Sequence, residues 1–232
     1  MILFDASKCV SCNSCIRACP TPEANKAVVA GDGRTIYDID PQKCIRCGAC
    51  VKDCPHGART FEDDTPAFWQ DIKSGQDVVL LVAPSIKVAF DGCWRNVLEY
   101  LRNNGVKNIY DVSFGADICT WAHLRYIRQN PGKKLISQPC PAIVNYILKY
   151  TPEIIPDLSP VQSPILCAAV YIRKYLGVNT KLAALTPCIA KRDEFRMTGI
   201  VDYNVTFEHL GALLEEKGFH LADQKGRRSA FE

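Results

Sequence analysis

The sequence has no long apolar run and no sustained run of one charge. Its apolar opening stops at Asp5, and no later apolar stretch reaches membrane-spanning length. We therefore expect no signal peptide, no membrane span and a cytoplasmic location. The formal net charge is only +3, and the nearest approach to a basic run is Lys225, Arg227 and Arg228. No nucleic-acid partner is expected from such a charge distribution.

The composition is that of a folded protein, with 47% hydrophobic and 23% charged residues. This balance argues against disorder and against a fibrous repeat. At 232 residues the chain is long enough for one small module and one domain of ordinary size. Two hydrophobic cores are therefore expected.

Cysteine is the residue in excess, with 13 in the chain. A disulfide scaffold explains them poorly, because their number is odd, no export signal is present and most of them lie in CxxC runs. Metal ligation is the better explanation.

The clearest internal repeat is the motif Cys-x2-Cys-x2-Cys-x3-Cys-Pro, which begins at Cys9 and again at Cys44. In such motifs three thiolates wrap one [4Fe-4S] cubane and the fourth reaches the other cluster. One cluster is expected to take Cys9, Cys12, Cys15 and Cys54, and the other Cys44, Cys47, Cys50 and Cys19. Two zinc sites are the alternative, since four thiolates also suit Zn²⁺, but the repeated tight triplets with a trailing proline favour iron. His56 is more typical of a surface residue than of a ligand.

Between the two motifs, β-prone runs at 27–30 and 35–39 flank a Gly-Asp-Gly-Arg turn and predict a β-hairpin. Residues 1–64 are thus expected to form an α+β ferredoxin-like module with two [4Fe-4S] clusters, which moves electrons one at a time.

After residue 64, apolar β-rich runs alternate with helical segments and predict an α/β domain with a parallel sheet over 65–232. The expected strands are Asp77–Ala83, Asn108–Ser113, Lys134–Ser137 and Lys181–Leu185. Cys140 and Cys188 each follow an expected strand, at the sheet edge where ligands gather beside helix N-termini. The two thiols indicate a metal site, although spacing alone leaves buried, hydrophobic cysteines as an equal alternative.

At these cysteines the chain resembles the large subunit of the [FeFe] hydrogenases, over nearly its whole length. The family motif Thr-Ser-Cys-Cys-Pro is similar to residues 137–141, and Met-Pro-Cys-x2-Lys-x2-Glu is similar to residues 186–194. The resemblance implies that Cys140 and Cys188 hold the cubane of the H-cluster. It also implies that Lys191, with Glu194 in the same motif, contacts a cyanide of the di-iron unit, and that Ser85 belongs to the segment that cradles the other cyanide. By spacing alone, Lys191 and Glu194 are typical of a solvated surface ion pair.

Two segments depart from the catalytic members. Pro139 stands where those members keep a cysteine that relays protons, and proline has no ionisable group. Ala122 and His123 stand where active members carry Glu-Glu. These changes resemble the sensory, poorly catalytic branch, which is thought to report H2 or redox state to signalling modules.

The family's third motif supplies two more cysteines, one of which bridges the cubane to the di-iron unit, and no cysteine follows Cys188 here. Residues 65–232 are therefore expected to be an incomplete catalytic domain, which binds an H-cluster only when the missing cysteine segment is supplied. Whether the chain is a shortened form, a natural fragment or part of a split protein stays open. Cys93, Cys119 and Cys167 are expected in the core, although Cys119 lies close to the changed relay positions.

Three functions follow from these features: an H2 or redox sensor of the hydrogenase family, a hydrogen-metabolising enzyme when complete, and a plain two-cluster electron carrier. The chain alone is expected to be inactive or very slow as an enzyme. Its expected partners are a redox protein, either a ferredoxin or a reductase, and a signalling module.

Overall fold

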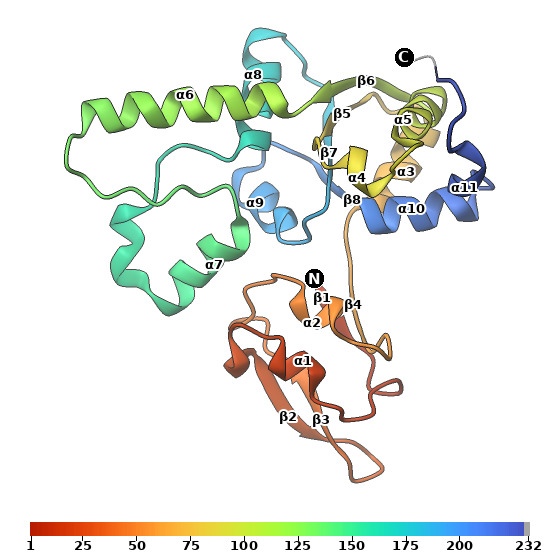
Figure 1. Ribbon diagram of the computed structural model, residues 1–232, viewed down its shortest axis with the longest axis vertical. Helices are drawn as coiled ribbons and strands as arrows, with labels where there is room; N and C mark the ends of the chain where they lie inside the picture. Colours follow the sequence, from red (N-terminus) through yellow and green to blue (C-terminus); the bar gives the residue numbers. More distant parts are fainter. Residues whose placement is uncertain (230–232) are drawn as a thin grey trace. The chain divides into compact units, whose positions relative to one another are not determined.

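The computed structural model describes residues 1–229, which divide into two compact units (Figure 1). The first unit contains Met1–Glu62 and Pro141–Ile155, and the second contains Asp63–Cys140 and the chain from Pro156 onward. The segment 141–155 thus packs with the first unit, whereas the sequence grouped it with the second; the domain limits 1–64 and 65–232 stay a prediction. Among the described residues, no helix is both long and apolar enough to cross a membrane.

The first unit has the pseudo-symmetry of its sequence. A short helix begins inside each cysteine motif, namely α1 (Ser14–Arg17) and α2 (Ala49–Lys52). Strands β1 (Ile2–Phe4) and β4 (Arg59–Phe61) pair antiparallel and bring the two ends of the unit together, with Ile2 opposite Phe61 and both side chains buried. No pattern in the sequence indicates this three-residue pairing.

The predicted hairpin is confirmed. Strands β2 (Asn25–Val29) and β3 (Thr35–Ile39) pair antiparallel after the 3-10 helix η1 (Pro22–Ala24), and Val29 lies opposite Thr35. The turn between them contains Gly33 at φ 81°, a conformation that glycine adopts without strain. The hairpin carries Arg34 towards the first cysteine motif, where it donates to the Cys9 carbonyl oxygen at 2.6 Å.

Helix α7 (Pro141–Tyr150) is the other part of the first unit, and the 3-10 helix η2 (Pro152–Asp157) follows it. Ala142 and Ile147 are buried, and polar side chains near its C-terminal end donate to carbonyl groups of the loop before Cys44. Because these contacts join segments about a hundred residues apart, no local pattern could have predicted them.

The second unit is built on a four-stranded parallel sheet of order β6-β5-β7-β8. The strands are β5 (Val78–Val82), β6 (Val106–Asp111), β7 (Lys181–Thr186) and β8 (Tyr203–Thr206). The expectations for β5, β6 and β7 are confirmed with small shifts at the ends. The central strands are almost wholly apolar, as a sheet covered on both faces requires.

The strand expected at Lys134–Ser137 is wrong. Only Ile136 forms a bridge there, with Leu158, outside the main sheet. The segment has two apolar residues between charged and polar ones, and Pro139 follows it, so it cannot form the buried strand that a parallel sheet needs. Strand β8, in contrast, was not expected, because its four residues include the polar Asn204 and Thr206.

Helices cover both faces of the sheet, as Figure 1 shows. One face packs against α3 (Thr65–Lys73), α4 (Ile86–Ala89), α5 (Trp94–Asn103), α10 (Phe207–Glu216) and α11 (Leu221–Gln224). The other packs against α6 (Ser113–Gln129), α8 (Pro164–Tyr175) and α9 (Lys191–Thr198). Alternate residues of β5 serve the two cores: Leu80 faces the first and Leu81 the second.

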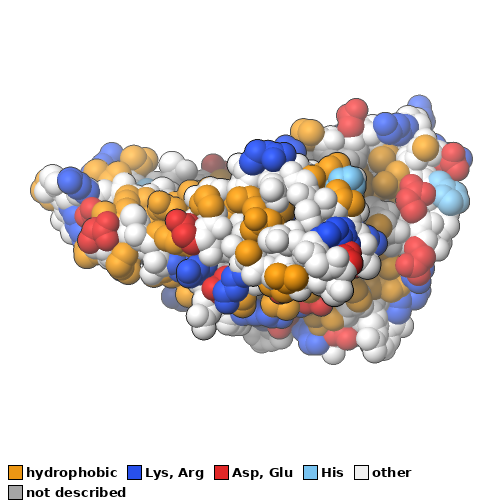
Figure 2. Space-filling model, turned by 90° about the horizontal axis from the view of Figure 1, so that it is seen from below, with side chains coloured by type: hydrophobic (Ala, Val, Ile, Leu, Met, Phe, Trp, Pro, Cys, Tyr) orange, Lys and Arg blue, Asp and Glu red, His pale blue; other side chains and the backbone are white. Residues whose placement is uncertain are grey.

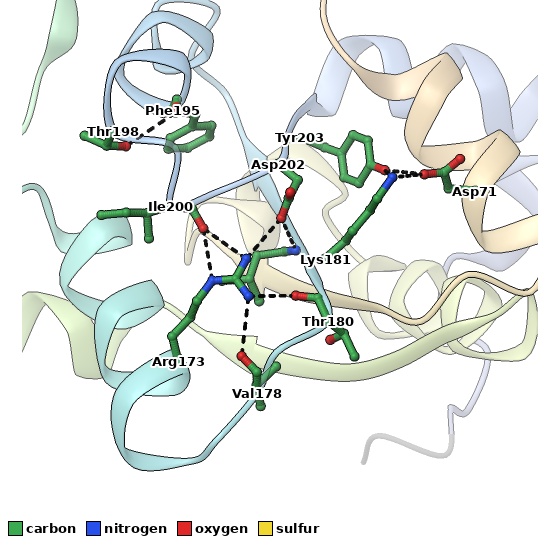
Figure 3. Close-up of polar contacts among 11 residues, drawn as sticks. Asp71, Arg173, Val178, Thr180, Lys181, Phe195, Thr198, Ile200, Asp202 and Tyr203 are labelled. Atoms are coloured by element: carbon green, nitrogen blue, oxygen red, sulfur yellow. Dashed lines mark hydrogen bonds and ion pairs between the residues drawn. The ribbon is translucent and has the colours of Figure 1, made fainter.

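The amino-terminal ends of β7 and β8 are fixed by polar contacts (Figure 3). The Lys181 ammonium donates to Asp71 at 2.6 Å and to the Tyr203 hydroxyl at 2.7 Å, and its hydrogen bond lowers the pKa of Asp71. The Arg173 guanidinium donates to the Thr180 carbonyl at 2.9 Å and to Asp202 at 3.2 Å. This network lies at the amino-terminal end of the sheet, whereas Cys188 follows the carboxyl end of β7. It stabilises the strands that support the Cys188 loop.

Charges of both signs are spread over the surface. On the face drawn in Figure 2, Lys and Arg side chains alternate with Asp, Glu and apolar ones, and no extended basic patch is visible there. This agrees with a net charge close to zero.

Candidate metal centres

The two cysteine loops share an unusual backbone. Ser11 and Asn13 have φ of 59° and 62° on either side of Cys12, and Arg46 and Gly48 have φ of 62° and 83° on either side of Cys47. Non-glycine residues in this region cost about 1–3 kcal/mol each and persist only where the surroundings impose them. Successive residues of this kind can turn main-chain N–H groups towards a common centre. Both loops are therefore shaped as cradles, at equivalent positions of the repeat.

The first cradle combines cysteines from both motifs. One cavity is lined by Cys9, Cys12 and Cys15 of the first motif together with Cys54 of the second. Arg59, which is 2% exposed, also lines it and approaches the Cys15 sulfur at 3.8 Å. The exposed His56 contributes to the lining as well. A buried arginine beside four thiols favours negative charge at this site.

The second cradle groups Cys19 with the three leading cysteines of the second motif. Burial raises the pKa of Cys50 to about 12; Arg59 opposes this rise, and the neighbouring Cys44, Cys47 and Cys19 add to it. Burial also raises the pKa of Cys44. Because ligation requires thiolates, filling this site would release protons. Cys54 of the second motif thus lies with the first cradle and Cys19 of the first motif with the second; that these cysteines bind metal stays a prediction.

In the second unit, Cys188 lies between β7 and α9, at the carboxyl end of the sheet. Its N–H donates to the Thr186 hydroxyl at 3.1 Å, and its carbonyl accepts from the Asn204 amide at 3.0 Å. Burial raises the pKa of Cys188, the N–H groups of Ala190 and Lys191 and the Lys191 charge oppose this, and the Cys140 thiol adds to the rise. The fold therefore brings Cys140 close enough to Cys188 to influence its charge, and Cys140 is exposed rather than part of a core.

Lys191 and Glu194 form a buried ion pair. The Lys191 Nζ and Glu194 Oε2 atoms are 2.6 Å apart, and the two side chains are only 8% and 13% exposed. The interpretation as a solvated surface pair is therefore wrong. Removing one partner of such a pair leaves an uncompensated buried charge. Ser85 is exposed and precedes α4, directly after β5, so it lies at the same edge of the sheet as Cys188.

The sequence missed the polar residues that position this loop. Asp64 accepts from the Asn204 main chain at 3.1 Å and from the Arg192 guanidinium at 2.9 Å. Asn204 is fully buried and reaches the Cys188 carbonyl, so Asp64 is linked through it to the cysteine loop. The polar Asn204, between Tyr203 and Val205 in β8, was the one available signal.

The remaining thiols lie among helices. Cys93 is 3% exposed and packs in the core directly before α5, as expected. Cys119 lies within α6, and Cys167 within α8. The Nδ1 atom of His123 lies 2.8 Å from the Cys119 carbonyl oxygen. Within residues 1–229, no three His, Cys, Asp or Glu side chains are arranged to bind a single metal ion.

Comparison with known proteins covers both units. Residues 76–230 match the family model of the iron-only hydrogenase large subunit, C-terminal domain, and residues 8–58 match a 4Fe-4S dicluster domain. A relative described as the periplasmic [Fe] hydrogenase large subunit of Nitratidesulfovibrio vulgaris is 26% identical over 253 aligned residues. The alignment covers 95% of this chain and 59% of that protein, so the chain spans about three fifths of the relative's length.

Proposed function

Because the chain belongs to the iron-only hydrogenase large-subunit family, we propose that it is an electron-transfer protein of that family which senses H2 or redox state. It turns over little H2 by itself. The observation that carries the proposal is the pair of cysteine cradles, which have residues with positive φ at equivalent positions and exchange their fourth cysteine.

We assign one [4Fe-4S] cluster to each cradle. Cys9, Cys12, Cys15 and Cys54 hold the first, and Cys44, Cys47, Cys50 and Cys19 hold the second. When bound, such clusters supply one-electron redox chemistry. The chain contributes four thiolates to each and the buried Arg59 guanidinium, which approaches Cys15 and acts on Cys50 and so offsets negative charge in both cradles.

The second unit is assigned a partial H-cluster site. Cys140 and Cys188 would hold two corners of its cubane once a segment with the missing cysteines is supplied. Glu194 fixes the Lys191 ammonium beside Cys188, where the cation suits a cyanide ligand. Ser85 reaches the same edge of the sheet from β5. The di-iron unit would supply the chemistry of H2, and these residues would bind and orient it.

Low turnover is proposed because the positions that would move protons are changed. Pro139 can neither give nor take a proton. The Nδ1 atom of His123 lies within hydrogen-bond distance of the Cys119 carbonyl oxygen. That nitrogen is therefore engaged with the helix backbone. A sensor needs binding and a change of redox state, and neither requires fast proton delivery.

Two other functions have support. A hydrogen-metabolising enzyme, active when the domain is complete, is favoured by the family match over residues 76–230. A plain two-cluster electron carrier is favoured by the match over residues 8–58. We propose a ferredoxin or a reductase as redox partner, a signalling module as the output of the sensor, and a cytoplasmic location.

Metal analysis and spectroscopy test the central assignment. The anaerobically purified chain should contain about eight irons and eight acid-labile sulfides, the content of two cubanes. The reduced protein should show the EPR signals of two reduced clusters. Tightly bound zinc without a reducible cluster would contradict the assignment. The variants Cys140→Ser and Cys188→Ser should keep both clusters, and loss of either cluster would contradict the separation of the two sites.

A further inference from the structure

The main-chain oxygen of the first cysteine in each motif accepts a hydrogen bond from a positively charged side chain. Arg34 donates to the Cys9 carbonyl oxygen at 2.6 Å, and Lys149 donates to the Cys44 carbonyl oxygen at 2.8 Å. Cys9 and Cys44 are equivalent in the repeat, but their cations have different origins. Arg34 belongs to the hairpin between the motifs, whereas Lys149 comes from α7, 105 residues beyond Cys44. The two sites thus have equivalent contacts that come from different parts of the chain.

The position of Lys149 is fixed by its neighbours on α7. Its ammonium also approaches the Pro41 carbonyl oxygen at 3.3 Å. Tyr150 donates to the Lys43 carbonyl at 2.8 Å, and Asn145, one turn before Lys149, donates to the Ile45 carbonyl at 3.3 Å. Helix α7 therefore binds successive carbonyl groups of the loop that leads into the second cradle. An exposed lysine anchored in this way is a localised charge rather than a mobile one.

We propose that Lys149 raises the reduction potential of the cluster in the second cradle, and that Arg34 does the same in the first. The inference rests on the proposed cluster binding. One-electron reduction adds a negative charge to a cluster, and no bond forms or breaks. A cation on the chain that carries the ligand stabilises the reduced form more than the oxidised form. Charge removal at Lys149 therefore makes reduction at the second cradle less favourable.

This arrangement connects the second cradle to the second half of the chain. Residues 1–62 contain both cysteine motifs and Arg34, but they do not contain Lys149. Helix α7, which carries it, begins at Pro141, directly after Cys140. The potential at the second cradle therefore depends on a helix that adjoins a proposed H-cluster ligand in the sequence, whereas Arg34, the cation at the first cradle, comes from the segment between the two motifs.

The test is an EPR-monitored redox titration of the full chain under anaerobic conditions, with dithionite as reductant. In Lys149→Gln one of the two reduction waves should move to lower potential while the other stays in place. A tenfold loss in the equilibrium constant of reduction corresponds to 59 mV for one electron, and we expect a shift of up to about that size. Arg34→Gln should move the other wave. Lys149→Arg, which keeps the charge, should stay close to the parent protein.

Two controls make the result specific. Lys133→Gln removes the same charge from the second unit, where Lys133 donates to the Tyr126 hydroxyl, and it should move neither wave. Raising the salt concentration should reduce the difference between Lys149→Gln and the parent, since Lys149 is exposed and its charge is screened. Iron content and circular dichroism of each variant verify that clusters and fold are retained.

Two outcomes would overturn the inference. If neither substitution changed the potential of either reduction wave, electrostatic tuning by these cations would be excluded. Equal shifts of both waves in Lys149→Gln would also exclude it. Either result would leave the cluster assignment intact. A parent protein without reducible clusters would overturn the proposed function and this inference together, so the two failures are distinguishable.

Discussion

The thiols of Cys119 and Cys167 donate to one and the same acceptor, the main-chain oxygen of Gln162, at 3.3 and 3.4 Å. Cys119 lies on α6 and Cys167 on α8, and the two helices cross closely at Gly115. Burial is the main cause that raises the pKa of Cys167 to about 11, and the neighbouring Cys119 adds to it. The two thiols therefore stay protonated at neutral pH and join two helices by hydrogen bonds, which is not the environment of a metal ligand.

The first prediction concerns these two thiols. The double variant Cys119→Ser, Cys167→Ser should bind the same amount of iron as the parent protein. Serine hydroxyls can donate to the Gln162 oxygen as the thiols do, so we expect the free energy of unfolding to change by only about 1 kcal/mol. Iron analysis and denaturant unfolding measure both quantities. Loss of a cluster would show that one of these cysteines had been wrongly excluded as a ligand.

A second prediction tests the crossing of α6 and α8. A Cβ atom built on Gly115 would lie 2.2 Å from the Pro164 carbonyl oxygen and 2.7 Å from the Ala168 side chain. Gly115→Ala should therefore force the helices apart and lower the free energy of unfolding by about 1–3 kcal/mol. Gly211→Ala on α10 is the matched control, because its Cβ would meet the nearest atom at an ordinary 3.6 Å. Equal stability of the two variants in denaturant would contradict the close crossing.

Local sequence signals predicted those parts of the fold that depend on neighbouring residues. The hairpin followed from two β-prone runs around a glycine turn, and β5 and β7 followed from short, almost wholly apolar runs. The exchange of Cys19 and Cys54 followed from the motif itself, because three thiolates on a tight loop leave the fourth to reach elsewhere.

Other features depend on contacts between distant segments, and the sequence could not reveal them. The burial of Lys191 and Glu194 is set by the elements packed around α9, while an i, i+3 spacing is the same on a surface or in a core. The contact of Lys149 with Cys44 joins residues 105 positions apart. Asn204 was missed because its side chain, on β8, donates to the carbonyl of Cys188 in the loop after β7. Local sequence does not reveal such a contact between two segments.

A third prediction concerns the pH dependence of stability. His209 lies 2.9 Å from the fully buried Asp63 carboxylate. The hydrogen bond with Asp63 raises the pKa of His209. For Asp63, burial opposes ionisation, but hydrogen bonds from His209, Thr206 and Thr65 outweigh it and lower its pKa. The folded protein thus favours the charged form of both groups.

The raised pKa of His209 determines the sign of the effect. Its contribution to stability is fully present below the unfolded pKa of about 6.5 and is lost as the pH rises through the higher folded value. The contribution of Asp63 persists across this range, since it is lost only as the pH falls through the lowered pKa of the carboxyl group. The free energy of unfolding should therefore decrease as the pH rises from about 6.5 through the raised folded pKa of His209, and His209→Gln should flatten that decrease. An unchanged pH profile in the variant would show that this pair does not control it.

The last prediction is that this chain by itself turns over H2 negligibly, even when a synthetic di-iron cofactor is supplied. The family resemblance requires four thiolates for the cubane of the H-cluster, and only Cys140 and Cys188 match. One of the two missing thiolates is the bridge to the di-iron unit, so that unit would lack its only protein bond. Electrons from the ferredoxin-like unit would then have no covalent route to it.

A complete site should still be slow. A positioned general acid or base typically contributes about 10²–10⁴-fold to a rate, and Pro139 cannot be that group. Evolution of H2 from reduced viologen is the assay, with the chain compared before and after addition of a Cys-x2-Gly-Cys segment. We expect no turnover in the first case and, in the second, a rate below that of a relative with a cysteine at the position of Pro139. Rapid turnover by the chain alone would refute both the sensor and the carrier, because it would require ligands from Cys93, Cys119 or Cys167, which the fold places among its helices.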